Sequence, residues 1–68
     1  MVRSMDVYQN YLVLRANLRL YSINIDTREI IKISTDMRDF DIIDGYIIYG
    51  DSDGKTYKVD FLGNPLDM

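Results

Sequence analysis

Several short stretches of the chain alternate between apolar and polar residues. Residues 21–26 are Tyr-Ser-Ile-Asn-Ile-Asp, and residues 57–61 are Tyr-Lys-Val-Asp-Phe. A period of two places one kind of side chain on each face of a β-strand, so both stretches predict strands with one apolar face. Residues 11–16 and 46–49 are rich in β-branched and aromatic side chains, which also favours strands.

Further strands are expected at residues 5–7, 30–33 and 40–42, where apolar residues recur two apart or in a short run. Turn-forming residues separate all of these segments, because Asn, Asp and Gly tolerate positive φ angles. The expected turns lie at residues 9–10, 16–17, 26–28, 44–45, 51–54 and 63–65. Residues 5–14 are the one segment that competes as a helix, and their Val and Tyr content favours strands instead. The pattern predicts an all-β chain of antiparallel strands.

The chain also resembles itself at a fixed offset. Shifted by 35 positions, residues 2–17 match residues 37–52 in apolar or polar character everywhere except at Ala16, if glycine counts as polar. From residue 19 onward the best offset is 36, which aligns Tyr21 with Tyr57, as expected of a shared core contact. We therefore predict one domain, residues 1–68, built from repeat one (2–36) and repeat two (37–68). The second repeat is predicted to be truncated, because only Leu66-Asp-Met is left to match its fourth strand.

The segment from Asp44 to Leu66 resembles a blade of the quinoprotein-like and related β-propellers. It runs from a glycine through an apolar strand, an Asp-Ser-Asp-Gly turn and a second apolar strand with an Asp near its end to another glycine. The first repeat matches more loosely, with Ala16-Asn17 in place of that turn, and neither repeat contains Trp. The resemblance implies two tandem antiparallel β-meanders. Propellers typically close with four to eight blades, so two imply an assembly of copies, a fragment of a longer chain, or two blades packed as a sandwich.

Composition removes most enzyme classes. The 68 residues include no Cys and no His, so thiolate metal sites, disulfides and His-based catalysis are excluded, and we expect no catalytic residues and no cofactor. With 8 Lys+Arg against 11 Asp+Glu, nucleic acid is not an expected partner. The apolar runs are too short to span a membrane, and the N-terminus does not resemble a secretory signal. The sequence leaves the compartment open and favours a cytoplasmic over a secreted protein.

Small domains without disulfides or metals usually need additional support for their core. We therefore expect a non-enzymatic structural or protein–protein interaction module that forms a homo-oligomer or binds a larger protein. Unpaired strands at the ends of the two repeats are natural contact points, because they leave backbone groups without partners. The predicted interface consists of Ile30, Ile31, Lys32, Ile33, Leu66 and Met68. One alternative is that the chain is a fragment of a larger ligand-binding or catalytic β-propeller.

Asp51 and Asp53 carry another alternative, a small calcium-binding module. Ca²⁺ prefers several oxygen ligands, and Asp-x-Asp-Gly is how a calcium-binding loop begins. The positions that would continue such a loop are Lys, Tyr and Val, and the only Glu of the chain is Glu29. A hairpin turn with solvated carboxylates is the simpler interpretation.

Three other groups of polar residues have structural interpretations. Arg3 and Asp6 recur as Arg38 and Asp41, and we expect ion pairs across strands or between repeats. The acidic residues 36, 39, 41 and 44 suggest a solvated linker between the repeats. The six tyrosines, without interleaved basic residues, are expected to pack within the fold or at a partner interface rather than bind nucleic acid.

Overall fold

The computed structural model describes residues 4–67 and contains seven β-strands in that range. They are β1 (Met5–Tyr8), β2 (Tyr11–Ala16), β3 (Arg19–Asn24), β4 (Ile30–Ser34), β5 (Asp39–Ile43), β6 (Tyr46–Gly50) and β7 (Thr56–Val59). The first four form an antiparallel sheet in the order β1-β2-β3-β4, and the last three form a second antiparallel sheet. No helix occurs within residues 4–67. The predicted all-β class is confirmed, and residues 5–14 form a hairpin.

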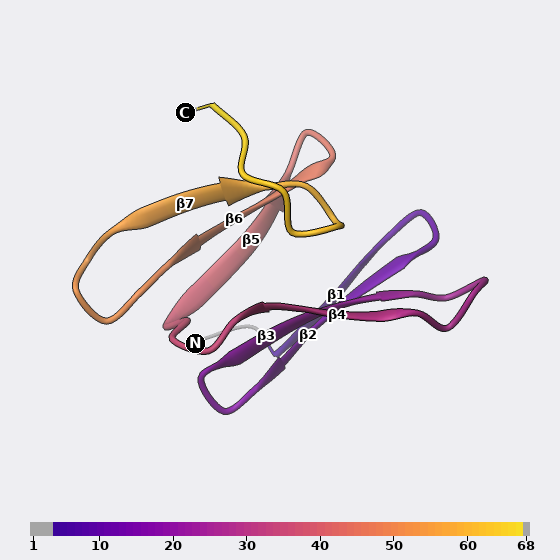
Figure 1. Cartoon of the computed structure of the whole chain (residues 1–68), viewed down its shortest axis with the longest axis horizontal. Helices are drawn as coiled ribbons and strands as arrows, with labels where there is room; N and C mark the ends of the chain where they lie inside the picture. Colours follow the sequence, from indigo (N-terminus) through magenta and orange to yellow (C-terminus); the bar gives the residue numbers. More distant parts are fainter. Residues whose placement is uncertain (1–3, 68) are drawn as a thin grey trace.

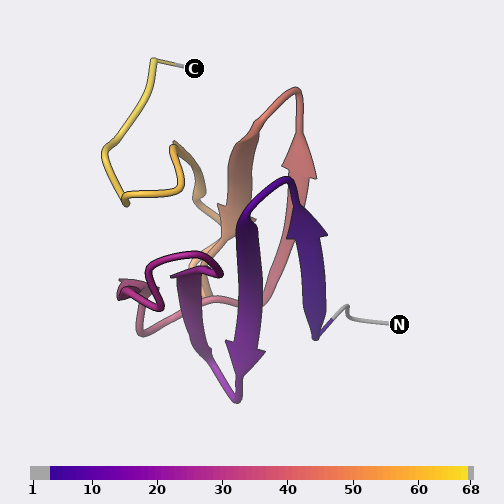
Figure 2. The same ribbon diagram turned by 90° about the vertical axis from the view of Figure 1, so that its right-hand side faces the viewer.

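The two sheets stack face to face, with β1 and β5 running in the same direction (Figures 1 and 2). Apolar side chains from both sheets fill the space between them and are almost completely removed from water. This core consists of Val13, Leu20, Met37, Phe40, Ile47, Val59 and Phe61. Met37 lies in the connection between the sheets, and its backbone N–H donates to the carbonyl oxygen of Leu18 at 2.8 Å. The connection is therefore part of the core.

The tight turns between strands depend on residues that accept positive φ. Asp44 and Gly45, between β5 and β6, have φ angles of 51° and 83°. Such pairs suit the two-residue turns that follow the twist of a hairpin. A Cβ atom on Gly45 would stand 3.1 Å from the hydroxyl oxygen of Tyr8, so the turn also passes close to the end of β1. The turn between β1 and β2 instead places Gln9 at a φ of 52°.

The strand pairing of the two sheets corresponds position by position. The pair Val7–Leu12 of the β1–β2 hairpin becomes Ile42–Ile47 in the β5–β6 hairpin, a shift of 35 on both strands. In the next hairpins, Leu12 pairs with Ile23, and Ile47 pairs with Val59. That shift is 35 on one strand and 36 on the other. The additional residue therefore lies in the longer β6–β7 loop.

The position of a fourth strand in the second sheet is occupied only briefly. Val59 forms an isolated bridge with Pro65, and the Leu66 backbone N–H donates to the Lys58 carbonyl oxygen at 2.8 Å. β4, by contrast, pairs with β3 over most of its length, with a bulge near Leu20 and Tyr21. The C-terminal segment therefore covers only part of the outer edge of β7.

The face of β3 that turns inward differs from the predicted apolar face. Leu20 and Ser22 are buried, whereas Tyr21 and Ile23 lie half-buried on the opposite side of the sheet. Tyr57, the counterpart of Tyr21, is 36% exposed, so the expected shared core contact of the two tyrosines is wrong. The four-stranded sheet carries apolar residues on both faces. Alternation alone therefore did not decide which face meets the other sheet.

Ser22 is a buried polar group in this core, and its hydroxyl has no hydrogen-bond partner in residues 4–67. Leaving a buried hydroxyl unpaired costs about 1–3 kcal/mol. We expect Ser22→Ala to raise the free energy of unfolding by about 1 kcal/mol, because part of that cost is offset by the weaker strand preference of alanine. Urea unfolding followed by circular dichroism checks this. A lower midpoint would show that the hydroxyl is satisfied in solution.

Candidate functional site

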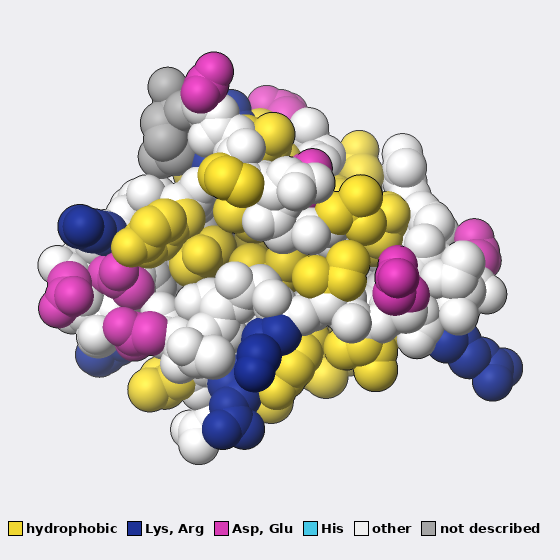
Figure 3. Space-filling view, in the orientation of Figure 1, with side chains coloured by type: hydrophobic (Ala, Val, Ile, Leu, Met, Phe, Trp, Pro, Cys, Tyr) yellow, Lys and Arg dark blue, Asp and Glu magenta, His cyan; other side chains and the backbone are white. Residues whose placement is uncertain are grey.

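The four-stranded sheet exposes an apolar layer on the side facing away from the three-stranded sheet. This apolar outer face consists of Met5, Val7, Leu12, Leu14, Tyr21, Ile23 and Ile30. Met5, Val7 and Ile30 remain 57%, 56% and 63% exposed. In Figure 3, hydrophobic side chains reach the lower rim of the molecule, next to this sheet. Antiparallel sheets usually present polar side chains to water, so an apolar layer of this kind is a candidate contact surface.

Two cationic residues border the apolar outer face. Lys32 pairs with Tyr21 across the β3–β4 ladder, and Arg19 pairs with Ala16 across the β2–β3 ladder. Directly paired residues point to the same side of an antiparallel sheet, and both cations are exposed. The rim of the apolar outer face is therefore positively charged along β3 and β4.

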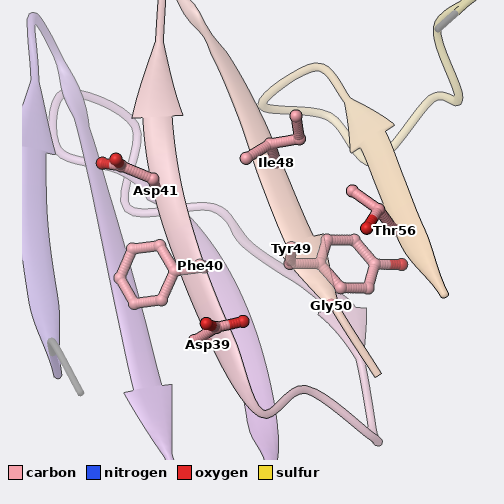
Figure 4. A pocket seen from close by; sticks show the side chains of 7 residues that line it. All are labelled: Asp39, Phe40, Asp41, Ile48, Tyr49, Gly50 and Thr56. Carbon is pink, nitrogen blue, oxygen red and sulfur yellow. The ribbon is translucent and has the colours of Figure 1, made fainter. Parts of the chain in front are cut away.

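The three-stranded sheet also has a side that faces away from the core, and this side is more polar. We call it the mixed outer face; it consists of Asp39, Asp41, Ile43, Tyr46, Ile48, Gly50, Thr56 and Lys58. A pocket of about 270 Å³ opens beside it, and Figure 4 shows its lining residues: Asp39, Phe40, Asp41, Ile48, Tyr49, Gly50 and Thr56. The Lys58 ammonium stands 4.3 Å from the centre of the Tyr46 ring, a cation–π contact.

Asp6 and Asp41, the residues that recur 35 positions apart, have the same role in their strands. Asp6 accepts a hydrogen bond from the backbone N–H of Val7 at 2.9 Å, and Asp41 accepts one from Ile42 at 2.8 Å. In each hairpin this residue forms no ladder hydrogen bond with the paired strand, so its N–H points to the outer edge of the sheet. The carboxylates therefore occupy donors at the open edges of β1 and β5, which discourages strand addition there. Of the expected ion-pair partners, Arg3 lies outside the described residues.

The residues predicted to form the interface separate into two groups. Ile30 and Lys32 point to the apolar outer face, whereas Ile31 and Ile33 point inward and approach Gly63. Leu66 is 38% exposed and is tied to β7 by its backbone, and Met68 lies outside the described residues. β4 is an edge strand of its sheet. The part of β4 open to a partner is its Ile30 and Lys32 side, together with its outer edge.

Asp51 organises the β6–β7 loop from within. Its Oδ1 accepts hydrogen bonds from the backbone N–H groups of Asp53 (2.9 Å) and Lys55 (3.0 Å), and its Oδ2 accepts one from the Tyr57 hydroxyl (2.9 Å). Desolvation raises the pKa of Asp51, but the hydrogen bonds from Tyr57, Lys55 and Asp53 outweigh it and leave the pKa below its ordinary value of 3.8. The same hydrogen bond raises the pKa of Tyr57. No group of three or more metal-binding side chains occurs in the described part of the chain.

Asp60 forms a similar centre after β7, at a position that the sequence did not mark as a site. Its Oδ1 accepts from the backbone N–H groups of Leu62 and Asn64, both at 2.9 Å, and its Oδ2 accepts from the Asn64 side chain at 3.1 Å. Desolvation raises the pKa of Asp60, yet the hydrogen bonds from Asn64, Leu62 and Gly63 lower it overall. Asn24, which corresponds to Asp60 at offset 36, likewise accepts from the backbone N–H groups of Asp26 and Thr27. The sequence signal for such a centre is an Asp or Asn directly before a turn, as at Asp60 and Asn24.

The two carboxylates predict a stability that falls in acid. A carboxyl group whose pKa is lower in the folded than in the unfolded chain stabilises the fold above the unfolded pKa, and this is lost as the pH falls through the folded pKa. The melting temperature should therefore decrease as the pH drops below about 4. Asp51→Asn and Asp60→Asn should each flatten this decrease, which a melting series from pH 6 to 2 measures. An unchanged slope in both variants would contradict the assignment.

The acidic residues near the start of the second sheet do not form the expected solvated linker. Asp39 and Asp41 belong to β5, and Asp44 to the following turn. Asp36 accepts a hydrogen bond from the Ser52 hydroxyl at 2.7 Å and so ties the connection to the β6–β7 loop. The interpretation as a linker is therefore wrong, because the apolar residues between these acids form a core strand.

The tyrosines are distributed between the interior and the surface. Tyr8 and Tyr11 stack on Phe61 with ring centroids 5.5 and 4.8 Å apart, and Tyr49 stacks on Tyr57 at 5.0 Å. These stacks join the inner face of the four-stranded sheet to the segment after β7, and β6 to β7. Their use in packing agrees with the structural interpretation from the sequence.

Comparisons of the chain with models of protein families, with curated proteins and with solved structures find no significant match. Residues 4–67 contain no helix that is long and apolar enough to cross a lipid bilayer. The candidate functional site therefore rests on geometry. Its main features are the apolar outer face, the mixed outer face with its pocket, and the open side of β4.

Proposed function

We propose that the chain is a non-enzymatic interaction module that associates with copies of itself through two blade-like β-meanders. The observation that carries this is the apolar outer face, where side chains such as Val7 and Ile30 remain more than half exposed. Burial of apolar surface is the main favourable term in protein association. The corresponding strand registers of the two sheets support the interpretation as tandem blade-like repeats, the second one truncated.

The native mass tests this proposal. A single chain has a mass of 8.0 kDa. Light scattering coupled to size-exclusion chromatography, over a hundredfold range of concentration, should give a multiple of that mass that decreases on dilution. A mass of one chain at every concentration would contradict self-association.

β4 supplies a specific prediction for this proposal. In an antiparallel ladder only alternate residues bond to the neighbouring strand, and the hydrogen bond from Asn24 to the Glu29 carbonyl sets the alternation. The N–H of Lys32 then points away from β3, toward the open edge. Lys32→Pro removes this donor without removing a bond to β3. We expect association to weaken by up to about tenfold, the value of one hydrogen bond.

Lys32→Ala is the matched control for that variant, because it removes the ammonium but keeps the backbone donor. Sedimentation velocity on both variants and the wild type separates the two contributions. An unchanged mass and melting temperature in Lys32→Pro would show that the backbone edge of β4 is not part of the contact.

A second candidate is that the chain is a piece of a larger ligand-binding or catalytic β-propeller. The same two outer faces favour it, because further repeats of one longer chain would cover them as copies would. A monomeric wild type that binds a hydrophobic dye would support this candidate over self-association.

A further inference from the structure

The two faces of each sheet can be compared through the offset that relates the strands. Moved by 35 positions, Val7 and Leu12 of the apolar outer face become Ile42 and Ile47, which lie on the inner face of the three-stranded sheet. Moved by 36, Ile23 becomes Val59 on that same inner face. The apolar outer face of one sheet therefore corresponds to the core-facing side of the other.

The remaining two faces correspond in the same way. Val13 and Tyr11, which face the core in the four-stranded sheet, become Ile48 and Tyr46 on the mixed outer face. Asp6, which lies on the same side of its sheet as Val13, becomes Asp41, which lies on the mixed outer face with Ile48. Each sheet thus has one side of each kind, and inside the chain a side of one kind packs against a side of the other kind. One side of each kind stays uncovered, namely the apolar outer face and the mixed outer face.

We propose that the apolar outer face of one copy packs against the mixed outer face of a second copy, repeating the contact that already joins the two sheets inside one chain. This rests on the proposed self-association and specifies its geometry. Because the two surfaces differ, the contact is head-to-tail, and each chain offers one surface of each kind. Such contacts close into a ring when a whole number of copies, each rotated by the same angle from the last, completes a full turn.

The charges on the two surfaces agree with this pairing. Arg19 and Lys32 border the apolar outer face, and Asp39 and Asp41 lie on the mixed outer face. Pairing the apolar outer face with its own copy would bring its two cations together, which disfavours that symmetric contact, whereas the mixed outer face carries Lys58 beside its two carboxylates. The head-to-tail arrangement brings cations toward carboxylates.

The shape of the mixed outer face also provides room for an opposing side chain. Gly50 and Thr56 stand where the four-stranded sheet has Arg15 and the buried Leu20, and the pocket of about 270 Å³ opens beside them. Met5, Val7 and Ile30 of the apolar outer face are among the large apolar side chains that remain more than half exposed in the single chain. The smaller residues on one surface leave space for the larger ones on the other.

Two variants that each block one surface test the arrangement. Val7→Lys places a charge on the apolar outer face, and Ile48→Lys places one on the mixed outer face. Thr56→Arg, at an exposed position lining the same pocket, replaces Ile48→Lys if that variant fails to fold by circular dichroism. Val7→Lys is mixed with the variant of the mixed outer face, and one of the two chains is labelled with ¹⁵N so that native mass spectrometry distinguishes them.

Each variant alone should have the mass of one chain, and the mixture should form a species containing one copy of each and nothing larger. A Val7→Lys or Ile48→Lys variant that still associates with itself would overturn the head-to-tail contact, as would a mixture that stays monomeric. A monomeric wild type would instead contradict the proposed self-association itself. The two failures are therefore distinguishable.

Discussion

Leu20→Ala is expected to lower the free energy of unfolding by about 3–4 kcal/mol, the usual cost of removing a leucine side chain from a core that cannot collapse around it. Leu20 is fully buried between the two sheets. A chain of this length has a total stability of roughly 3–10 kcal/mol, so the variant should lose a large part of it. Urea unfolding of variant and wild type at one protein concentration gives the difference.

Leu18→Ala is the matched control, because Leu18 lies in the turn just before β3 and its side chain is 43% exposed. Its truncation should cost less than about 1 kcal/mol. Equal losses at both positions would contradict the assignment of the inward face of β3. That outcome would restore Tyr21 and Ile23 as the core-facing residues.

Phe61→Ala is the second large effect that we expect, a loss of about 3–5 kcal/mol. Phe61 is buried, and the rings of Tyr8 and Tyr11 both stack on it. Their planes are tilted from that of Phe61 by only 7° and 11°, respectively. It is the contact through which the segment after β7 holds the β1–β2 hairpin. Thermal and urea unfolding, together with the near-ultraviolet tyrosine signal, measure the loss.

Phe61→Leu distinguishes packing from aromatic stacking at this position. Leucine keeps much of the buried apolar surface, so we expect a loss of only about 1–2 kcal/mol, most of it from the two ring contacts. If leucine is as damaging as alanine, the stacked geometry rather than burial dominates. If alanine itself is tolerated, the segment from Asp60 to Leu66 does not hold the two sheets together.

Much of the strand pattern was predictable from the sequence, because period-two alternation and turn-forming residues act locally. The strands at residues 11–16 and 46–49 and the turn at 44–45 were expected and are present. The face of β3 was not predictable, because Tyr21, Ile23 and Leu20 are all apolar and the buried Ser22 reverses the simple rule. Which face is buried depends on the opposing sheet, and that contact is not local in sequence.

The candidate site was predictable only in part. The sequence directed attention to β4, and the structure places Ile30 and Lys32 of that strand on the open surface. It gave Asp51 as a cation ligand only as an alternative to a hairpin turn, and the Asp51 carboxylate accepts hydrogen bonds from its own loop. The apolar outer face itself was missed, because it emerges only when Val7, Leu12 and Ile23 are aligned across three strands. Single-strand patterns do not contain that alignment.

Isotope-filtered nuclear Overhauser spectroscopy is the most direct test of the proposed head-to-tail contact between copies. A sample mixes chains carrying ¹³C-labelled methyl groups with unlabelled chains, so that only contacts between chains are detected. We predict contacts from the methyl groups of Val7 and Leu12 of one chain to Ile48 of another. Contacts of Ile48 with Ile48, of Val7 with Val7, or no contact between chains at a concentration where the mass exceeds 8.0 kDa, would contradict the head-to-tail arrangement.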